Sequence, residues 1–201
     1  MKSLIAAAIL GLSLTSAASA ATVFSDDFNT DIQGAPQATL SQWAIVSGSI
    51  DVIGPGSFDW CGAGQGNCLD MNGSTSMAGR IETTIFSLIV GKIYTLTFDF
   101  GNNQNSQFLT PPEVLSFGLG ATSYALNIFA QSALTASLAY TFTAGSTSEI
   151  LFFADIGTSP GDNGGPLLDN VVLSTVPLPA GGLLLLGALG GIAALRRRKT
   201  A

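Results

Sequence analysis

Between Thr22 and Thr175 no long segment has the hydrophobic period of a helix, and alternation of apolar and polar residues dominates instead. The clearest case is Ile93–Phe100, in which every second residue from Tyr94 onward is aromatic or aliphatic. A side-chain period of two belongs to a β-strand with one face buried. We therefore expect this part of the chain to be all-β.

Further segments with strand character are separated by turn residues. They are Trp43–Ile53, Ile81–Ile89, Ser123–Phe129, Leu138–Thr143, Glu149–Ala154 and Leu167–Ser174. The short break Val90–Lys92 predicts a hairpin between Ile81–Ile89 and Ile93–Phe100. Strands at this spacing favour a β-sandwich of the Greek-key or jelly-roll type.

The N-terminus has the features of a secretory signal peptide. Lys2 supplies a positive charge, Leu4–Leu14 is an apolar core, and Ala18-Ser19-Ala20 is a small-x-small cleavage site. The apolar core is too short for a stable membrane helix. Residues 1–20 are therefore predicted to be removed by signal peptidase.

The C-terminal residues 176–201 combine a proline-rich start, an apolar span and a basic end. Pro177 and Pro179 require any helix to begin after them. As a helix, the uncharged run from Gly181 to Leu195 would reach roughly 22 Å, or roughly 27 Å when counted from Leu178, which is just short of a hydrocarbon core of about 30 Å. Four basic residues follow and resist translocation, namely Arg196, Arg197, Arg198 and Lys199. The pattern predicts a single membrane helix with a cytoplasmic tail.

The order of motif, short span and basic cluster resembles the C-terminal sorting tail of the PEP-CTERM class, in its VPLPA variant. The motif residues are Val176, Pro177, Leu178, Pro179 and Ala180. The resemblance implies that an exosortase recognises the tail and removes it. We then expect transient residence in the inner membrane, followed by delivery to the cell surface or extracellular matrix. The expected organisation is a signal peptide (1–20), a β-sandwich domain (21–175) and a sorting signal (176–201).

Removal of both ends changes the charge balance. Only Arg80 and Lys92 remain against thirteen acidic residues, which gives a net charge of −11. A domain this acidic repels nucleic acid and anionic lipid and attracts divalent cations. Nucleic acid is therefore not an expected partner.

Cys61 and Cys68 flank a glycine-rich segment. In an exported chain, a close pair of cysteines predicts a disulfide, worth about 2.5 kcal/mol on the chain-entropy model. A two-cysteine metal site is the alternative, but the chain has no histidine to complete it.

The interior of the chain carries a second resemblance. Four blocks, Trp43–Ile53, Leu69–Ser74, Gly91–Phe100 and Gly165–Val172, occur in the order of the choice-of-anchor C family and are more distantly similar to galactose-binding-like jelly rolls. Family members usually have Phe-Glu near the first strand, where this chain has Phe28-Asn29. This departure removes one carboxylate.

The resemblance implies a structural calcium ion held between the last strand and the first. The residues at matching positions are Asp169 with Asp27 or Asn29, and Asp70 as an additional ligand. Carboxylate, amide and carbonyl oxygens are the ligands that Ca²⁺ takes.

The residues themselves leave two roles open for Asp169. Asp169 is in phase with Val171 and Leu173, so if those two residues face the core, Asp169 faces it too, and a carboxylate there needs a compensating partner. Alternatively, Asp169 accepts hydrogen bonds from the backbone of Asn163–Gly165.

Sugar binding needs exposed aromatic rings and nearby amides. Trp60 lies in the predicted disulfide loop, and Asn102, Asn103 and Gln104 follow the strand that ends near Phe100. The alternative for Trp60 is that it anchors the loop by covering the disulfide.

The absence of histidine excludes Ser-His-Asp and Cys-His catalysis and histidine-ligated zinc. Paired carboxylates could hydrolyse glycosides, but the sequence nominates no pair. We therefore expect a non-enzymatic protein that binds or organises exopolysaccharide. The alternatives are a structural or adhesion matrix protein without a sugar site, and a secreted carbohydrate-active enzyme.

Overall fold

The computed structural model describes residues 19–37, 39–56, 58, 60–62, 64–102, 113–128, 134, 136–157 and 163–177. Most of the predicted signal peptide lies outside these residues, as do Leu178, Pro179, Ala180, the apolar span and the basic cluster Arg196–Lys199. In the part of the chain that is described, no helix is long and apolar enough to cross a membrane.

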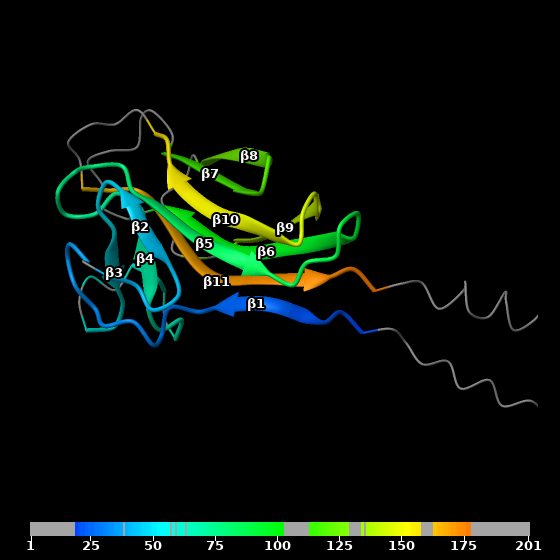
Figure 1. Cartoon of the computed structure of the whole chain (residues 1–201). Coiled ribbons are helices and arrows are strands. Elements are labelled where there is room, and N and C mark those ends of the chain that lie inside the picture. The colour runs from blue at the N-terminus through cyan, green and yellow to red at the C-terminus, as the bar shows by residue number, and fades with distance from the viewer. Residues whose placement is uncertain are drawn as a thin grey trace, which may run out of the picture. The chain divides into compact units, whose positions relative to one another are not determined.

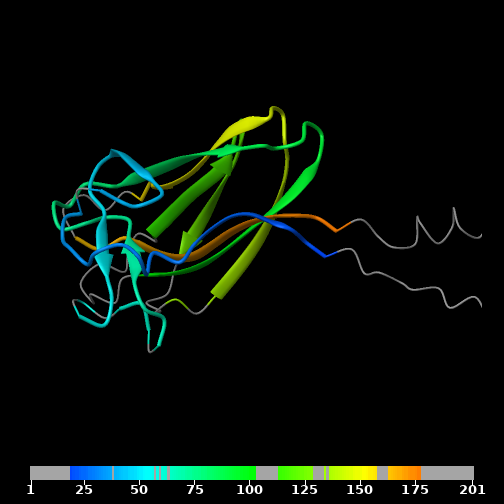
Figure 2. The same ribbon diagram turned by 60° about the horizontal axis from the view of Figure 1, so that its bottom comes forward.

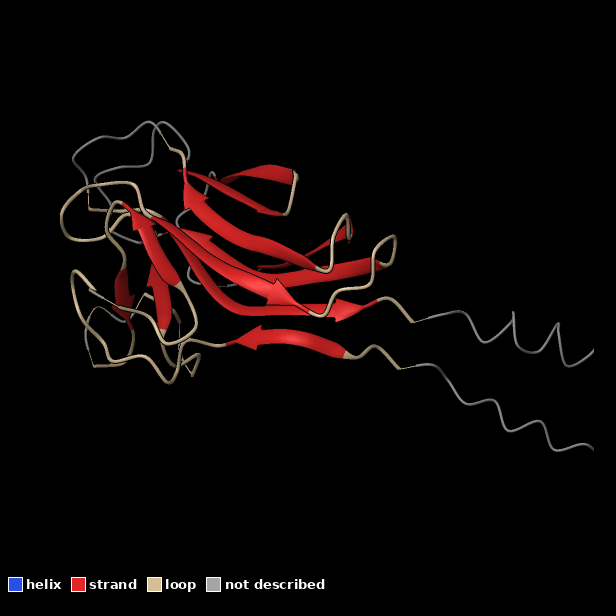
Figure 3. Cartoon of the chain, in the orientation of Figure 1, coloured by secondary structure: helices blue, strands red, loops and turns tan. Residues whose placement is uncertain are grey.

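Ala21–Val176 is a compact unit built from two β-sheets (Figures 1 and 3). One sheet has the strand order β3-β4-β11-β6-β9, with β1 also paired to β11, and the other has the order β2-β5-β10-β7-β8. The prediction of an all-β sandwich is confirmed. The strands are β1 (Thr22–Asp26), β2 (Ala44–Ser47), β3 (Asp51–Ile53), β4 (Cys68–Asp70), β5 (Arg80–Phe86), β6 (Ile93–Asn102), β7 (Glu113–Leu119), β8 (Thr122–Ile128), β9 (Ala136–Thr143), β10 (Ser148–Asp155) and β11 (Pro166–Thr175).

The core lies between the two sheets and follows the alternation of β6. Tyr94, Leu96 and Phe98 are all buried in it. The ring of Phe98 lies 4.8 Å from that of Phe117 in β7 and 5.1 Å from that of Phe153 in β10. These edge-on contacts join the sheets, because β7 and β10 belong to the five-stranded sheet.

Strand β11 organises the six-stranded sheet. One of its edges pairs with β6 along most of its length. The other edge is shared, because β4 pairs with Leu167 and Leu168, whereas β1 pairs with residues 171–174. Asp169 and Asn170 lie between these two partners.

Two sequence predictions about connectivity are wrong. Trp43–Ile53 is not one strand, because β2 and β3 belong to different sheets. The chain turns at Gly48, which has a φ of +67° and lies so close to Ala78 that an added Cβ would be 2.0 Å from its carbonyl oxygen. Only glycine fits this position.

The predicted hairpin between β5 and β6 also crosses from one sheet to the other. Leu88 is buried in the core between the sheets, and the turn that follows it is closed by the Lys92 N–H, which donates to the Ile89 carbonyl at 3.0 Å. The turn therefore joins the two sheets and does not join paired strands. The Ile89 N–H donates to Tyr94 Oη at 2.9 Å and fixes the path of the connection.

Candidate functional site

The predicted disulfide between Cys61 and Cys68 is confirmed, with Cα atoms 5.8 Å apart. Both cysteines are buried in a small cluster with Ile53 of β3 and Leu167 of β11. The ring of Trp60 is partly buried against this cluster. Trp60 therefore covers the disulfide with part of its ring, as the alternative reading expected, and leaves the rest exposed.

The exposed part of Trp60 lines a pocket of about 140 Å³. Phe58 stands beside it with the two ring centroids 5.3 Å apart and the ring planes inclined at 40°. Phe58 is 58% exposed, so its ring is open to solvent. The two rings form an aromatic wall that solvent reaches.

Polar groups from three other segments line the same pocket, namely Asp51 of β3, Ser74 of the turn after β4, and Asn163 of the loop before β11. The Asp51 carboxylate accepts the Ser74 hydroxyl at 2.5 Å and the Ser74 N–H at 3.0 Å. Asn163 Oδ1 accepts the Ser76 hydroxyl. The carboxylate and the amide are therefore held in place before any ligand arrives.

Of the two described residues that were predicted for sugar binding, Trp60 lines the pocket. Asn102 is buried at the end of β6, opposite Pro166, and does not line the pocket. Asn103 and Gln104 lie outside the described residues. The residues that sequence reasoning missed are Asp51, Phe58, Ser74 and Asn163. Phe58 could have been found as a second aromatic residue in the loop of Trp60, whereas the other three come from distant segments.

Asp169 does not face the core as its phase with Val171 predicted. The pairing of β11 with β6 shifts by one residue between Asp169 and Val172, and Asn170 has a φ of +49°. This bulge changes which face the later residues occupy, so Leu168 and Val171 both pack in the core. Asp169 instead lies opposite Asp99 on the outer face of the sheet.

Asp169 is nevertheless fully buried. Among the described residues its hydrogen bonds come from Asn170, whose N–H lies 2.7 Å from Oδ1 and whose Nδ2 lies 3.3 Å from Oδ2. The alternative donors, the backbone groups of 163–165, are not its partners. The pKa of Asp169 is raised to about 7, chiefly by burial and also by the carboxylates of Asp99, Asp27 and Asp26, while the hydrogen bond from the Asn170 N–H opposes the rise.

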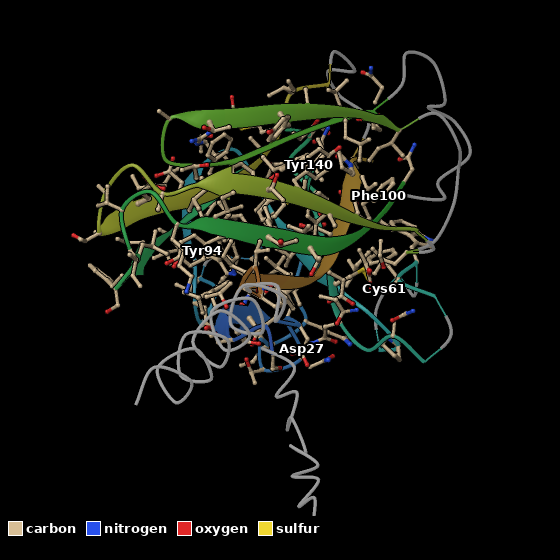
Figure 4. All side chains as sticks on the ribbon, turned by 90° about the vertical axis from the view of Figure 1, so that its right-hand side faces the viewer. Asp27, Cys61, Tyr94, Phe100 and Tyr140 are labelled. Atoms are coloured by element: carbon tan, nitrogen blue, oxygen red, sulfur yellow. A yellow bond between two sulfur atoms is a disulfide. The ribbon has the colours of Figure 1, made fainter. Side chains whose placement is uncertain are left out.

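The other predicted calcium ligands differ in their surroundings. Asp27 follows β1 (Figure 4) and lines a cavity of about 250 Å³ that Asn170 also lines. Asn29 Oδ1 accepts the Asn67 N–H at 2.8 Å, and Asp70 Oδ1 accepts the Asn72 N–H at 3.0 Å. In the described part of the chain, no three acidic or cysteine side chains are grouped closely enough to be recognised as a metal site.

No family model matches this chain. It is 30% identical over 150 residues to halomucin from Haloquadratum walsbyi, an alignment that covers 74% of the chain and spans about 2% of the length of halomucin.

Two solved structures share the fold with a TM-score of 0.50. The CBM22-1 xylan-binding domain of Xyn10C from Paenibacillus barcinonensis is 14% identical, with 81% of this chain and 99% of that domain covered. The K3 cleaved adhesin domain of Lys-gingipain from Porphyromonas gingivalis W83 is 16% identical, with 79% of this chain and 100% of that domain covered. At such identities these similarities describe the fold alone.

Proposed function

We propose that this protein binds or organises exopolysaccharide through the Trp60 pocket and has no catalytic activity. The observation that carries the proposal is the solvent-accessible pair Phe58 and Trp60 beside the fixed carboxylate of Asp51. The apolar face of a pyranose ring stacks on aromatic rings, while its hydroxyls bond to carboxylates and amides.

The volume of the pocket and the fixed positions of its polar side chains support a sugar chain as ligand. A volume of about 140 Å³ is below the roughly 300–1,000 Å³ of a typical small-molecule pocket. It suits one ring of a longer polymer whose other rings remain in solvent. Because Ser74 and Ser76 already hold Asp51 and Asn163, little side-chain entropy is lost on binding.

The cellular setting in this proposal comes from the two ends of the chain. Signal peptidase would remove residues 1–20, and the residues 181–195 would hold the protein in the inner membrane until an exosortase acts near Val176–Ala180. The domain, as a galactose-binding-like jelly roll of the choice-of-anchor C type, would then act at the cell surface or in the extracellular matrix.

The same proposal includes a structural calcium ion near Asp169. Asp169 is buried among carboxylates that raise its pKa, and a divalent cation would offset this repulsion. The candidate ligands are Asp169 of the last strand and Asp27 or Asn29 after the first, with Asp70 as an additional ligand. Each of these side chains already accepts one backbone N–H group, so a calcium ion would bind through its remaining oxygen lone pairs.

Affinity electrophoresis tests the function. The mature protein should be retarded in gels that contain the exopolysaccharide of its own host, and the polysaccharide should gain no new reducing ends. Mobility that no polysaccharide changes would favour a structural matrix protein, and release of reducing ends would favour an enzyme. Either result would contradict the proposal.

A further inference from the structure

A group of exposed apolar side chains marks one end of the sandwich, in and around the connection between β5 and β6. Phe86, Ile89, Val90 and Ile93 are 68%, 59%, 59% and 48% exposed, and we call these four residues the apolar tip. Single exposed apolar residues are common, but a contiguous group usually marks an interaction surface.

The exposure of the tip is built into the fold. Leu88, between Phe86 and Ile89, is anchored in the core. The Gly91 N–H donates to the Ala144 carbonyl at 2.8 Å, and the Ala144 N–H donates to the Lys92 carbonyl at 3.0 Å. These bonds tie the tip to the neighbouring turn between β9 and β10. Its apolar side chains are therefore held outward by an ordered backbone.

The tip lies where the compact unit begins and ends. Thr175 of β11 pairs with Tyr94, and the Val176 N–H donates to the Ile93 carbonyl at 3.4 Å. Figures 1 and 2 show the connection between β5 and β6 at the end of the sandwich where β1 starts and β11 stops. Residues 177–180 can span at most about 14 Å before the apolar run from Gly181 begins.

The tip also differs in charge from the rest of this acidic domain. Between residues 83 and 98 the only charged residue is Lys92, and between 136 and 148 there is none. The carboxylate of Glu149 accepts the N–H groups of Gly145 and Ser146 in the adjacent turn. The repulsion expected between the whole domain and a lipid surface is therefore weakest here.

We propose that the apolar tip rests in the interface of the membrane while the tail is still attached. The inference depends on the proposed membrane span of residues 181–195, because only that span brings the domain to a bilayer. Apolar side chains with an adjacent lysine are suited to the boundary between headgroups and acyl chains. The Trp60 pocket, near the opposite end of β11, then faces away from the membrane.

Quenching by brominated lipid tests this contact in the full chain. The Ile89→Trp variant is reconstituted in vesicles of phosphatidylcholine with brominated or ordinary acyl chains. Ile32→Trp is the matched control, because Ile32 is 82% exposed and lies in the loop after β1, at the other end of the sandwich. Trp43 and Trp60 contribute the same background to both variants.

We expect brominated chains to reduce the added emission of Ile89→Trp at least twofold and to leave that of Ile32→Trp unchanged. Equal quenching of both variants, with the tail protected from protease by the vesicles, would overturn the tip contact but not the tail. A blue-shifted Ile89→Trp emission that bromine does not quench would mean that a second copy of the chain covers the tip, which also overturns it. A chain that fails to associate with vesicles would overturn both tail and tip, whereas polysaccharide binding is tested separately.

Discussion

Asp169 is a buried carboxyl whose charged neighbours are other carboxylates. Its pKa in the folded protein, about 7, lies above the usual value of 3.8. At a pH between these two pKa values, Asp169 is protonated in the folded state and ionised in the unfolded state. The free energy of unfolding should therefore fall as the pH rises from about 4 to about 7, and the loss should be complete above that range.

The Asp169→Asn variant removes this titration. In the presence of chelator we expect it to be more stable than wild type at pH 8, by up to a few kcal/mol at about 1.4 kcal/mol per pKa unit. At pH 4 the two proteins should differ little. Urea unfolding at both pH values measures this, with Glu149→Gln of the other sheet as control. A variant that is equally destabilised at both pH values would contradict the account.

If the proposed site exists, calcium should restore the stability that the folded protein loses when the buried Asp169 carboxyl is ionised. At a free concentration one hundred times Kd, binding stabilises the folded state by about 2.7 kcal/mol. For a domain of this length the melting temperature should rise by roughly 5–10 °C. Chelator should abolish the rise, and Asp169→Asn should not show it. Melting curves of the wild type that coincide with calcium and with chelator would exclude the site.

At the scale of elements, alternation located most of the longer strands. The phase of β6 was predicted residue by residue, and so were the approximate positions of β5, β8, β9, β10 and β11. β4 is too short for a period to be recognised, and β7 was missed although Leu115, Phe117 and Leu119 alternate. Sheet membership and the bulge at Asn170 could not be predicted, because they depend on contacts such as that of Gly48 with Ala78.

The disulfide fixes the loop that carries Trp60. Replacing both cysteines by alanine should lower the free energy of unfolding by about 2.5 kcal/mol from chain entropy, with a further loss from the vacated space near Ile53 and Leu167. Urea unfolding of the double variant measures the change, and Ser123→Ala, at an exposed position of β8 in the other sheet, serves as a remote control. A loss below about 0.5 kcal/mol would mean that the loop is ordered without the bond.

For the whole molecule, the sequence reasoning reached the fold class and one aromatic residue of the candidate site. Trp60 was found because it is a local feature of the disulfide loop. Asp51, Ser74 and Asn163 come from segments that only the assembled sandwich brings together. The pairing of Cys61 with Cys68 could be predicted because the two cysteines are close in sequence.

The mature protein should lack both ends of the chain. We expect the intact mass of protein recovered from the cell surface to correspond to a chain that begins near Ala21 and stops near Ala180. The small-x-small site follows the apolar segment Leu4–Leu14, and the motif at 176–180 precedes the apolar run Gly181–Leu195. Cleavage at these two places would remove both apolar segments. Recovery of an extracellular chain that still ends in Arg-Arg-Arg-Lys-Thr-Ala would contradict exosortase processing.

The most direct test of the central claim is calorimetric titration of the mature protein with fragments of exopolysaccharide. Wild type should show saturable binding, and Trp60→Ala should bind at least tenfold more weakly, a loss of about 1.4 kcal/mol. Phe86→Ala, which removes an exposed ring from the opposite end, should bind as wild type does. Trp60→Phe, which still covers the disulfide, should retain part of the affinity. Binding that survives Trp60→Ala unchanged, or a wild type that binds none of the fragments, would contradict the account.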